Sequence, residues 1–220
     1  MGLEKHFRHR AIALLLFGAA APAAAQTGIG VKVGSLGIGP EFTKSLKRDV
    51  NLRLGANFFN HGYAGTEDDV EYDFKLKLKS ATGLIDLHPG GGSFRVSGGL
   101  VVNDNALDAV GVPTGTYRIG NTTYTGAQVG TLTGRVDFRR TSPYGGIGFG
   151  NMAKGSGPGF FLDLGVVFQG SPRVTLTASG PAAGAPQFQE DLRREETNLR
   201  NDLKVFKYYP VVALGVVVKF

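Results

Sequence analysis

The sequence contains no cysteine and no tryptophan, and its 220 residues include only two methionines. Without cysteine the chain forms no disulfide bond, so it lacks the usual cross-link of small exported folds. Long apolar segments are also missing after residue 25, because charge or glycine interrupts each apolar run within a few residues. A helix that spans a bilayer needs about 20 apolar residues, so none is predicted there, and any membrane contact would be made by strands.

The first 25 residues have the pattern of a secretory signal peptide. Lysine and arginine side chains precede an apolar stretch at residues 11–17, and Ala23–Ala25 supply small residues at the cleavage positions. The apolar stretch is too short for a permanent membrane helix. We therefore expect export through the Sec pathway and a mildly basic mature chain that starts at Gln26.

Glycine and aromatic residues are abundant, with 34 Gly, 15 Phe and 7 Tyr. This composition is typical of repeated strands that are apolar on one face and polar on the other. A soluble exported β protein has similar averages. The order of residues along each strand therefore has to distinguish the two classes.

The clearest alternation lies at residues 70–79. Five apolar residues alternate with five charged ones, Val70, Tyr72, Phe74, Leu76 and Leu78 on one face and Glu71, Asp73, Lys75, Lys77 and Lys79 on the other. Such alternation predicts a strand with one apolar and one charged face. Periodicity alone leaves open whether the apolar face lies in the core of a soluble sandwich or meets lipid around a barrel.

Similar alternation predicts the other strands. They are expected at residues 28–33, 36–46, 50–59, 94–103, 134–150, 160–169 and 208–220, with a small hairpin at 117–124 and an extension of the 160–169 strand at 173–177. The apolar positions change parity around Ser80–Gly83, which predicts a bulge there. Loops are expected at residues 62–69, 104–130 and 180–206.

The period becomes helical at residues 187–205. A narrow apolar stripe is formed by Phe188, Leu192, Leu199, Leu203 and Phe206. Oppositely charged residues lie four positions apart on the polar side, and a proline precedes the segment. The sequence therefore predicts one amphipathic helix immediately before the last strand.

The connections between predicted strands alternate between short and long. Outer-membrane barrels have short periplasmic turns and longer extracellular loops, whereas a soluble sandwich has no reason for this alternation. We therefore predict an all-β, antiparallel, up-and-down transmembrane β-barrel of about eight strands. Residues 26–220 would form this single domain.

An eight-stranded barrel is just wide enough for side chains to fill its interior. The predicted inward faces carry charges of both signs: Arg53, Glu71, Asp73, Lys75, Lys77, Lys79, Arg95, Asp137 and Asp163. Buried charges persist when they are paired, so these residues are expected to form an ion-pair network that fills the lumen. On this assignment Lys77→Leu would destabilise the protein more than Leu76→Val.

The last strand carries a further signal. Gly215 and the terminal Phe220 resemble the outer-membrane assembly signal, in which a glycine, an aromatic two residues before the end and a terminal aromatic are read by the insertion machinery. Val218 stands where that aromatic is usual, and Ala213 where a polar residue is usual. Together with the signal peptide and the alternating strands, this resembles small Gram-negative outer-membrane β-barrel proteins of the OmpA/OmpX and OmpW-like group.

The resemblance implies a location in the outer membrane and contact with its lipid and lipopolysaccharide. It also implies recognition by the barrel assembly machinery through Gly215, Val218 and Phe220. Members of such a group include structural and adhesion proteins, narrow solute channels and a few enzymes, so the fold leaves the activity open. We expect a monomer.

Candidate chemistry is sparse. His61 and His88 would lie about a membrane thickness apart, roughly 25 Å, so they cannot share a metal or a proton. The acidic segment Glu67–Asp69 lacks the spacing of a calcium loop, and Gly145–Gly150 falls within a strand pattern instead of a phosphate loop. The dispersed basic residues do not indicate nucleic acid. We expect no catalytic residue, no cofactor and no metal site.

Two functions remain open at this stage. The first is a structural or interaction role in the outer membrane for a barrel with a charged, largely filled lumen. The second is a porin-like role as a narrow passive channel for small solutes. Conductance in planar bilayers would distinguish them.

Overall fold

The computed structural model describes residues 26–67 and 70–220, and the side chains of residues 66–71 are not described. The predicted signal peptide lies outside these residues. Within them, thirteen strands form an eleven-stranded sheet and a separate hairpin. No helix in the described part of the chain is long and apolar enough to cross a membrane.

The elements have the following bounds. The strands are β1 (Thr27–Gly34), β2 (Gly37–Lys47), β3 (Val50–Glu67), β4 (Val70–Leu87), β5 (Phe94–Asn103), β6 (Ala106–Pro113), β7 (Thr116–Ile119), β8 (Thr122–Thr125), β9 (Leu132–Asp137), β10 (Thr141–Phe149), β11 (Gly157–Phe168), β12 (Arg173–Ala178) and β13 (Tyr208–Lys219). The helices are η1 (Pro89–Gly91), α1 (Gly126–Val129), η2 (Pro181–Gly184), α2 (Pro186–Asp202) and η3 (Leu203–Lys207).

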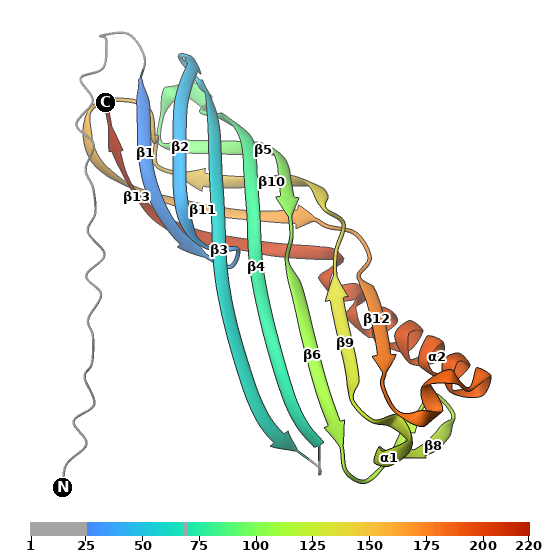
Figure 1. Cartoon of the computed structure of the whole chain (residues 1–220). Coiled ribbons are helices and arrows are strands. Elements are labelled where there is room, and N and C mark those ends of the chain that lie inside the picture. The colour runs from blue at the N-terminus through green and yellow to red at the C-terminus, as the bar shows by residue number, and fades with distance from the viewer. Residues whose placement is uncertain (1–25, 68–69) are drawn as a thin grey trace, which may run out of the picture.

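Eight strands are hydrogen-bonded in a ring. The order is β4-β3-β2-β1-β13-β11-β10-β5, and β5 pairs back onto β4 through Ser80 to Leu87. Every pairing in the ring is antiparallel. The strands curve around a common interior (Figure 1). The predicted number of about eight strands is therefore lower than the observed total of thirteen, because only part of the sheet belongs to the ring.

The other three strands of the sheet extend the wall beyond the ring. The first half of β4 pairs with β6, and β9 and β12 follow outward (Figure 1). The predicted loop at 104–130 was therefore wrong over residues 106–113, which form β6, whereas the hairpin predicted at 117–124 is present as β7 and β8. Residues 62–67 also continue β3 instead of forming a loop, and residues 173–177 pair with β9 instead of extending β11 in the ring. We call β6, β9, β12 and the outer halves of β3 and β4 the extension.

Connections at the two ends of the ring differ in length. At one end, short segments join β2 to β3, β4 to β5 and β10 to β11, and the backbones of Thr27 and Phe220 pair through hydrogen bonds. At the other end the chain passes through the extension between β5 and β10, and through β12 and α2 between β11 and β13. The predicted alternation holds for the connections that pass through the extension. It fails at β1–β2, where Ser35 and Leu36 form a tight turn, and at β3–β4, where the strands continue to Glu67 and Val70.

The ring is apolar on its outside and polar on its inside. Outward residues that are 38% to 82% exposed include Ile29, Val31, Val33, Ile38, Phe42, Leu54, Phe58, Ile85, Leu87, Phe94, Val96, Leu100, Val102, Ile147, Phe149, Phe160, Leu164, Phe168, Val212, Leu214, Val216, Val218 and Phe220. Inward polar residues that are 7% exposed or less include Lys32, Glu41, Thr43, Asn51, Arg53, Asn57, Ser80, Thr82, Asp86, Arg95, Ser97, Asn103, Ser142 and Asp163. A soluble sandwich would place these rows the other way round.

The predicted bulge in β4 is absent. β3 and β4 pair in continuous register from Val50–Leu87 to Glu67–Val70. Because side chains alternate without interruption, Lys75, Lys77 and Lys79 share the outer face with Ile85 and Leu87. The prediction that these lysines face the interior depended on a bulge near Ser80–Gly83. The structure does not contain that bulge, so the prediction was wrong.

Helix α2 packs beside β12 at the far end of the extension (Figure 1). Phe188 and Leu192 are buried with Ile119, Tyr124 and Val129 of the adjoining hairpin segment. Strand β12 is an edge of the sheet, and Glu196 of α2 accepts a hydrogen bond from the amide of Leu176 at 2.8 Å. The helix therefore covers an edge that could otherwise pair with another chain.

Candidate functional site: the filled interior of the ring

Arg53 lies at the centre of the charged interior. Its guanidinium donates to Asp163 at 2.8 Å and to Asp86 at 2.9 Å, and it lies 3.4 Å from Glu41. Glu41 also accepts a hydrogen bond from Lys32. A buried guanidinium with three carboxylate neighbours is stabilised because each partner offsets the cost of removing the others from water.

Arg95 completes the network from β5, which is separated from the strand of Arg53 by β4. It donates to Asp163 at 2.7 Å and lies 3.9 Å from Asp86. It also donates to the carbonyl of Phe149 at 3.0 Å, which ties the network to the backbone of β10. Six residues thus form one linked set with three positive and three negative charges: Lys32, Glu41, Arg53, Asp86, Arg95 and Asp163. We call this set the ion-pair layer.

The ion-pair layer contains three of the nine residues predicted for it, Arg53, Arg95 and Asp163. Lys75, Lys77 and Lys79 are exposed on the outer face of the extension, and Asp73 pairs there with Lys75. Asp137 lies on β9 and pairs with Arg135 and Arg173. The side chain of Glu71 is outside the description. The lysine-rich half of β4 extends past the ring, so its charges have no interior to occupy.

Sequence reasoning missed the other three members, Lys32, Glu41 and Asp86. Each has the signal that was used elsewhere, because each is a charged residue between two apolar ones. Lys32 lies between Val31 and Val33, and Asp86 between Ile85 and Leu87. These short alternating segments were therefore sufficient to predict that the three charged side chains point into the ring.

Glycines on the inner wall leave room for the large inward side chains. A Cβ at Gly148 would lie 2.8 Å from the guanidinium carbon of Arg95. A Cβ at Gly215 would lie 2.2 Å from the ring of Phe161. Gly215 therefore has a packing role in the ring, in addition to the assembly role that its position near the C-terminus predicts. Val218 and Phe220 lie on the outer face and are 40% and 45% exposed.

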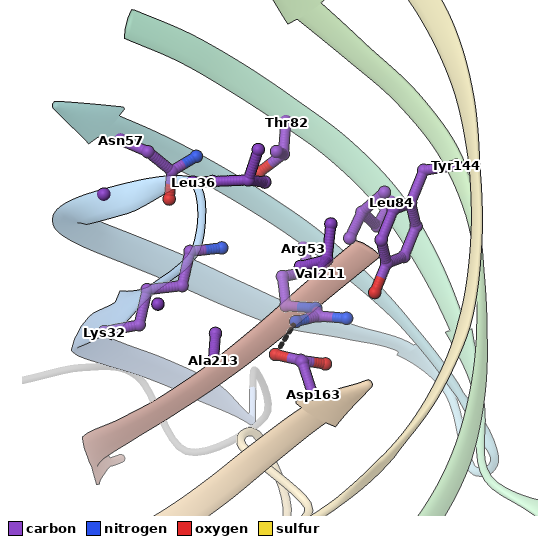
Figure 2. Close-up of a pocket in the computed structure, with 12 residues that line it drawn as sticks. Lys32, Leu36, Arg53, Asn57, Thr82, Leu84, Tyr144, Asp163, Val211 and Ala213 are labelled. Atoms are coloured by element: carbon purple, nitrogen blue, oxygen red, sulfur yellow. Dashed lines mark hydrogen bonds and ion pairs between the residues drawn. The ribbon is translucent and has the colours of Figure 1, made fainter. Parts of the chain in front are cut away.

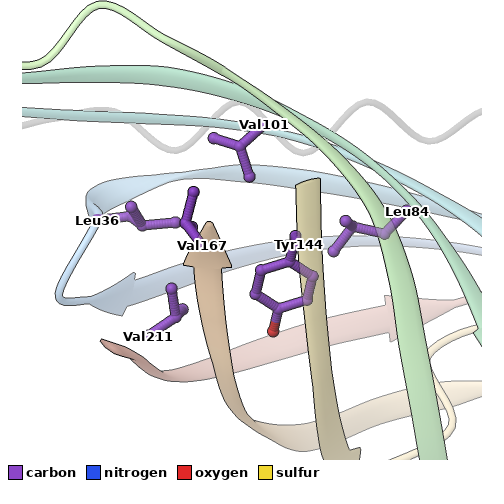
Figure 3. Close-up of a cluster of buried hydrophobic side chains, with 6 residues drawn as sticks. All are labelled: Leu36, Leu84, Val101, Tyr144, Val167 and Val211. Carbon is purple, nitrogen blue, oxygen red and sulfur yellow. The ribbon is translucent and has the colours of Figure 1, made fainter. Parts of the chain in front are cut away.

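An apolar cluster lies beside the ion-pair layer. Its members are Leu36, Leu84, Val101, Tyr144, Val167 and Val211, whose side chains converge inside the ring (Figure 3). Along β11, Phe161, Asp163, Val167 and Gln169 all point inward and are buried. Their order places this apolar cluster, which we call the plug, between the ion-pair layer and the end of the ring with long connections.

The space that remains between the two layers is small. A cavity of about 20 Å³ lies among Lys32, Arg53, Tyr144 and Asp163 (Figure 2). A single water molecule needs about 10–15 Å³ measured in this way. The cavity therefore has room for about one water molecule and not for an organic solute.

The two histidines predicted to be isolated lie far apart in the sheet. His88 is buried after β4, where its ring nitrogens lie 3.0 Å from the carbonyl of Gly92 and 3.2 Å from the amide of Asn51. Burial lowers the pKa of His88, so the ring stays neutral at pH 7. His61 is on the outer half of β3 and stacks on Phe59.

A second polar cluster joins α2 to the β7–β8 hairpin. Asp191 is fully buried and accepts a hydrogen bond from the Tyr124 hydroxyl at 2.9 Å. A hydrogen bond from Thr122, together with those from Tyr124 and Gln187, lowers the pKa of Asp191 to about 2. Gly120 makes the hairpin turn with φ +58°, as the predicted turn about Gly120–Asn121 requires. This carboxylate is therefore ionised at neutral pH and fixes the helix on the hairpin.

These features define a class of fold: an antiparallel ring of strands, apolar outside, with a charged and filled interior. The chain is similar in fold to two solved structures from Acinetobacter baumannii. CarO2 superposes with a TM-score of 0.59 at 23% identity, over 88% of this chain and 98% of CarO2. CarO superposes with a TM-score of 0.57 at 23% identity, over 88% of this chain and 97% of CarO.

No protein-family model matches the chain, and a sequence comparison with curated proteins gives no match. The similarity to the two structures shows a shared fold. The narrower resemblance to the OmpA/OmpX and OmpW-like group stays a prediction.

Proposed function

We propose that the protein is a β-barrel of the Gram-negative outer membrane with a structural or interaction role and a lumen that is filled. The observation that carries the proposal is the exposed apolar exterior around a buried charged interior. In water, a wall of exposed leucine, valine and phenylalanine would promote aggregation. In a bilayer the same wall is solvated by hydrocarbon, and the ring leaves no unpaired strand edge.

The dimensions of the ring support a membrane span. Strand β13 has 12 residues, which corresponds to a length of about 40 Å. At a tilt of about 40°, it rises about 30 Å along the barrel axis. The apolar band of outer-membrane barrels is about 25 Å tall. The strand is therefore long enough to cross it.

The outer face of β4 gives the position of one membrane boundary. It carries Ile85 and Leu87 in the ring but Lys79, Lys77 and Lys75 beyond it, without any change of register. The apolar part of this face faces lipid in the proposal, and the charged part faces water. The extension would then project from the membrane on the side with the long connections, which is extracellular in such barrels.

The extension supplies the surface for an interaction role. Its outer face carries a row of exposed ion pairs that crosses β4, β6, β9 and β12. Lys77 and Arg135 both pair with Asp108, and Arg173 pairs with Asp137. Such a charged face is soluble and is available to ions, lipopolysaccharide headgroups or other molecules outside the cell.

The similar structures agree with the proposed location, since CarO is an outer-membrane β-barrel protein of Gram-negative bacteria. The ion-pair layer and the plug argue against the alternative of a narrow passive channel, because the cavity between them has room for about one water molecule. In the proposal the lumen stabilises the barrel and does not conduct.

The remaining parts of the proposal follow from the sequence. The signal peptide would direct Sec export, and the C-terminal strand with Gly215, Val218 and Phe220 would be read by the barrel assembly machinery. The exposed apolar exterior would contact outer-membrane lipid and lipopolysaccharide. We assign no catalytic residue, cofactor or metal, and we expect a monomer.

Two measurements test the proposal. The protein should fractionate with outer membranes and migrate faster on a denaturing gel before boiling than after it, because a folded barrel resists the detergent. A soluble periplasmic location would exclude it. Purified protein in planar bilayers should give no reproducible conductance steps, whereas steady small steps would favour the channel.

A further inference from the structure

An apolar cavity lies where the ring meets the extension. Its volume is about 260 Å³. The wall on one side comes from β4, β6 and β9, and the wall on the other from η3 and the start of β13. The apolar lining residues include Leu76, Leu78, Leu107, Val136, Leu203 and Phe206.

The polar side chains around the cavity have partners elsewhere. The Gln169 amide donates to the carbonyl of Phe206 at 2.9 Å and accepts from Asn103 at 3.3 Å. The Tyr209 hydroxyl donates to the carbonyl of Ser35. Asn105 accepts from the amide of Lys79 at 2.7 Å. None of the lining side chains is charged. A ligand with its own charge would lose hydration there without gaining a partner.

The volume is sufficient for a small organic molecule. An engineered apolar cavity of about 150 Å³ stays dry and binds benzene. The cavity here is larger, about 260 Å³, and it is partly open, since Leu76, Leu107 and Phe206 are 36%, 37% and 46% exposed. It has room for a larger apolar group, such as a short alkyl chain or a substituted ring.

Two side chains, Tyr209 and Gln169, lie between the cavity and the interior of the ring. Tyr209 lines the cavity and also packs against the plug, and buried Gln169 lies at the same level. The other side of the cavity wall carries charge, since Lys77, Asp108 and Arg135 alternate with the lining residues on β4, β6 and β9. In the proposed arrangement this charged face lies in water, so the cavity on the other face of the same strands also lies outside the lipid, and its occupant is a free molecule that arrives from the aqueous side.

We propose that this cavity binds one uncharged apolar small molecule, a short alkyl or aromatic compound, at the mouth of the ring without passing it through the lumen. The inference goes beyond the proposed structural role, and its choice of a free molecule over a lipid chain rests on the membrane boundary proposed above.

The absence of tryptophan permits a direct test. The variant Phe206→Trp places a single indole at the cavity, and bromohexane quenches indole fluorescence on contact. Titration of the folded, purified variant with bromohexane should give saturable quenching. The matched control Leu214→Trp places the indole on the outer wall, where partition of bromohexane into detergent should give quenching that rises without saturation.

A cavity-filling variant separates binding from partition. Phe206→Trp combined with Val136→Phe should lose the saturable phase while it keeps the gel shift of the folded protein. Quenching of Phe206→Trp that parallels the Leu214→Trp control, or saturable quenching that survives Val136→Phe, would overturn the proposal.

Vesicles of phosphatidylcholine with brominated chains distinguish the source of the apolar group. We expect quenching of Leu214→Trp and none of Phe206→Trp. Equal quenching of both would show that a lipid chain fills the cavity, which would overturn the assignment to a free molecule. Loss of quenching at Leu214→Trp alone would count against the membrane barrel and leave the bromohexane result intact.

Discussion

At the scale of residues, a charged side chain inside the ring contributes more to stability than a charged side chain on the extension. Arg53 is 1% exposed and contacts Glu41, Asp86 and Asp163. The side chain of Lys77 is 49% exposed and pairs only with Asp108 among the carboxylates described. Water screens the second pair and not the first. The ranking expected from the sequence, with Lys77→Leu more harmful than Leu76→Val, rested on an interior position that Lys77 does not have.

The first prediction compares these two cations. Arg53→Met should lower the free energy of unfolding by about 3–5 kcal/mol, because it leaves three buried carboxylates without their central partner. Lys77→Met should change it by no more than about 1 kcal/mol. Urea unfolding in lipid vesicles, followed by the gel shift, measures both. Equal midpoints would contradict the assignment of Arg53 to a buried layer.

The second prediction concerns Gly215. Gly215→Ala should destabilise the ring by about 1–3 kcal/mol, because its methyl group would overlap the ring of Phe161. The control Gly83→Ala places a methyl 3.9 Å from Leu54 and should have little effect. Thermal midpoints of the gel shift compare them.

Combining Gly215→Ala with Phe161→Leu tests the origin of the effect. The shorter side chain should restore much of the lost stability if the glycine serves packing. A defect in assembly that the second substitution leaves unchanged would instead indicate that Gly215 acts as a signal.

At the scale of elements, β4 is one strand in two environments. Its outer face is apolar in the ring and lysine-rich in the extension, and its inner face carries Ser80 and Thr82 in the ring but Leu76 and Leu78 beyond it. An uninterrupted strand keeps its side chains alternating, so the pattern changes parity when the surroundings change. A bulge would also change the parity of the apolar positions, and one was predicted from the sequence for that reason.

Helix α2 gives the third prediction. The pKa of Asp191 is lowered to about 2, against about 3.9 for an unfolded aspartate, so its contribution to stability is complete above about pH 4. It should be lost as the pH falls from about 4 toward 2. The protection of the β7–β8 hairpin against hydrogen exchange, measured relative to the intrinsic exchange rate at each pH, should therefore fall over that interval. In Asp191→Asn the exchange should already be fast at pH 7 and show no such transition.

At the scale of the whole molecule, the ring, its filled interior and the projecting extension imply an orientation. The short connections lie at one end of the ring together with Thr27 and Phe220, and the extension lies at the other end. In an outer-membrane barrel the short turns are periplasmic. Lys154, in the β10–β11 connection, and Lys77, on the extension, are both exposed and would therefore lie on opposite sides of the membrane.

The fourth prediction uses the absence of cysteine, which makes single-cysteine variants unambiguous. On intact cells, Lys77→Cys should react with a membrane-impermeant maleimide, and Lys154→Cys should react only after the outer membrane is permeabilised. Ile85→Cys should resist labelling under both conditions because it faces lipid. Labelling of Lys154→Cys alone on intact cells would reverse the proposed orientation.

Alternation along the chain was enough to predict much of the ring. The faces of β13, the inward position of Arg53, Arg95 and Asp163, and the hairpin at 117–124 all follow from residues two or four apart. The helix predicted at 187–205 begins at Pro186 and changes to a 3₁₀ turn after Asp202. Local side-chain periodicity contains this information because neighbouring residues share one backbone geometry.

Contacts between segments that are distant in the sequence determine the environment of each strand face, whether water, the interior of the ring or its exterior. Lys77 is exposed to water because β6 and not β5 pairs with its half of β4. Arg53 is buried because three other strands, β2, β4 and β11, bring carboxylates to it. The assembly of the extension from β6, β9 and β12 left no signal in alternation, since an alternating strand pairs equally well inside the ring or beyond it. Periodicity distinguishes the two faces of a strand, and only the tertiary pairing determines what lies against each.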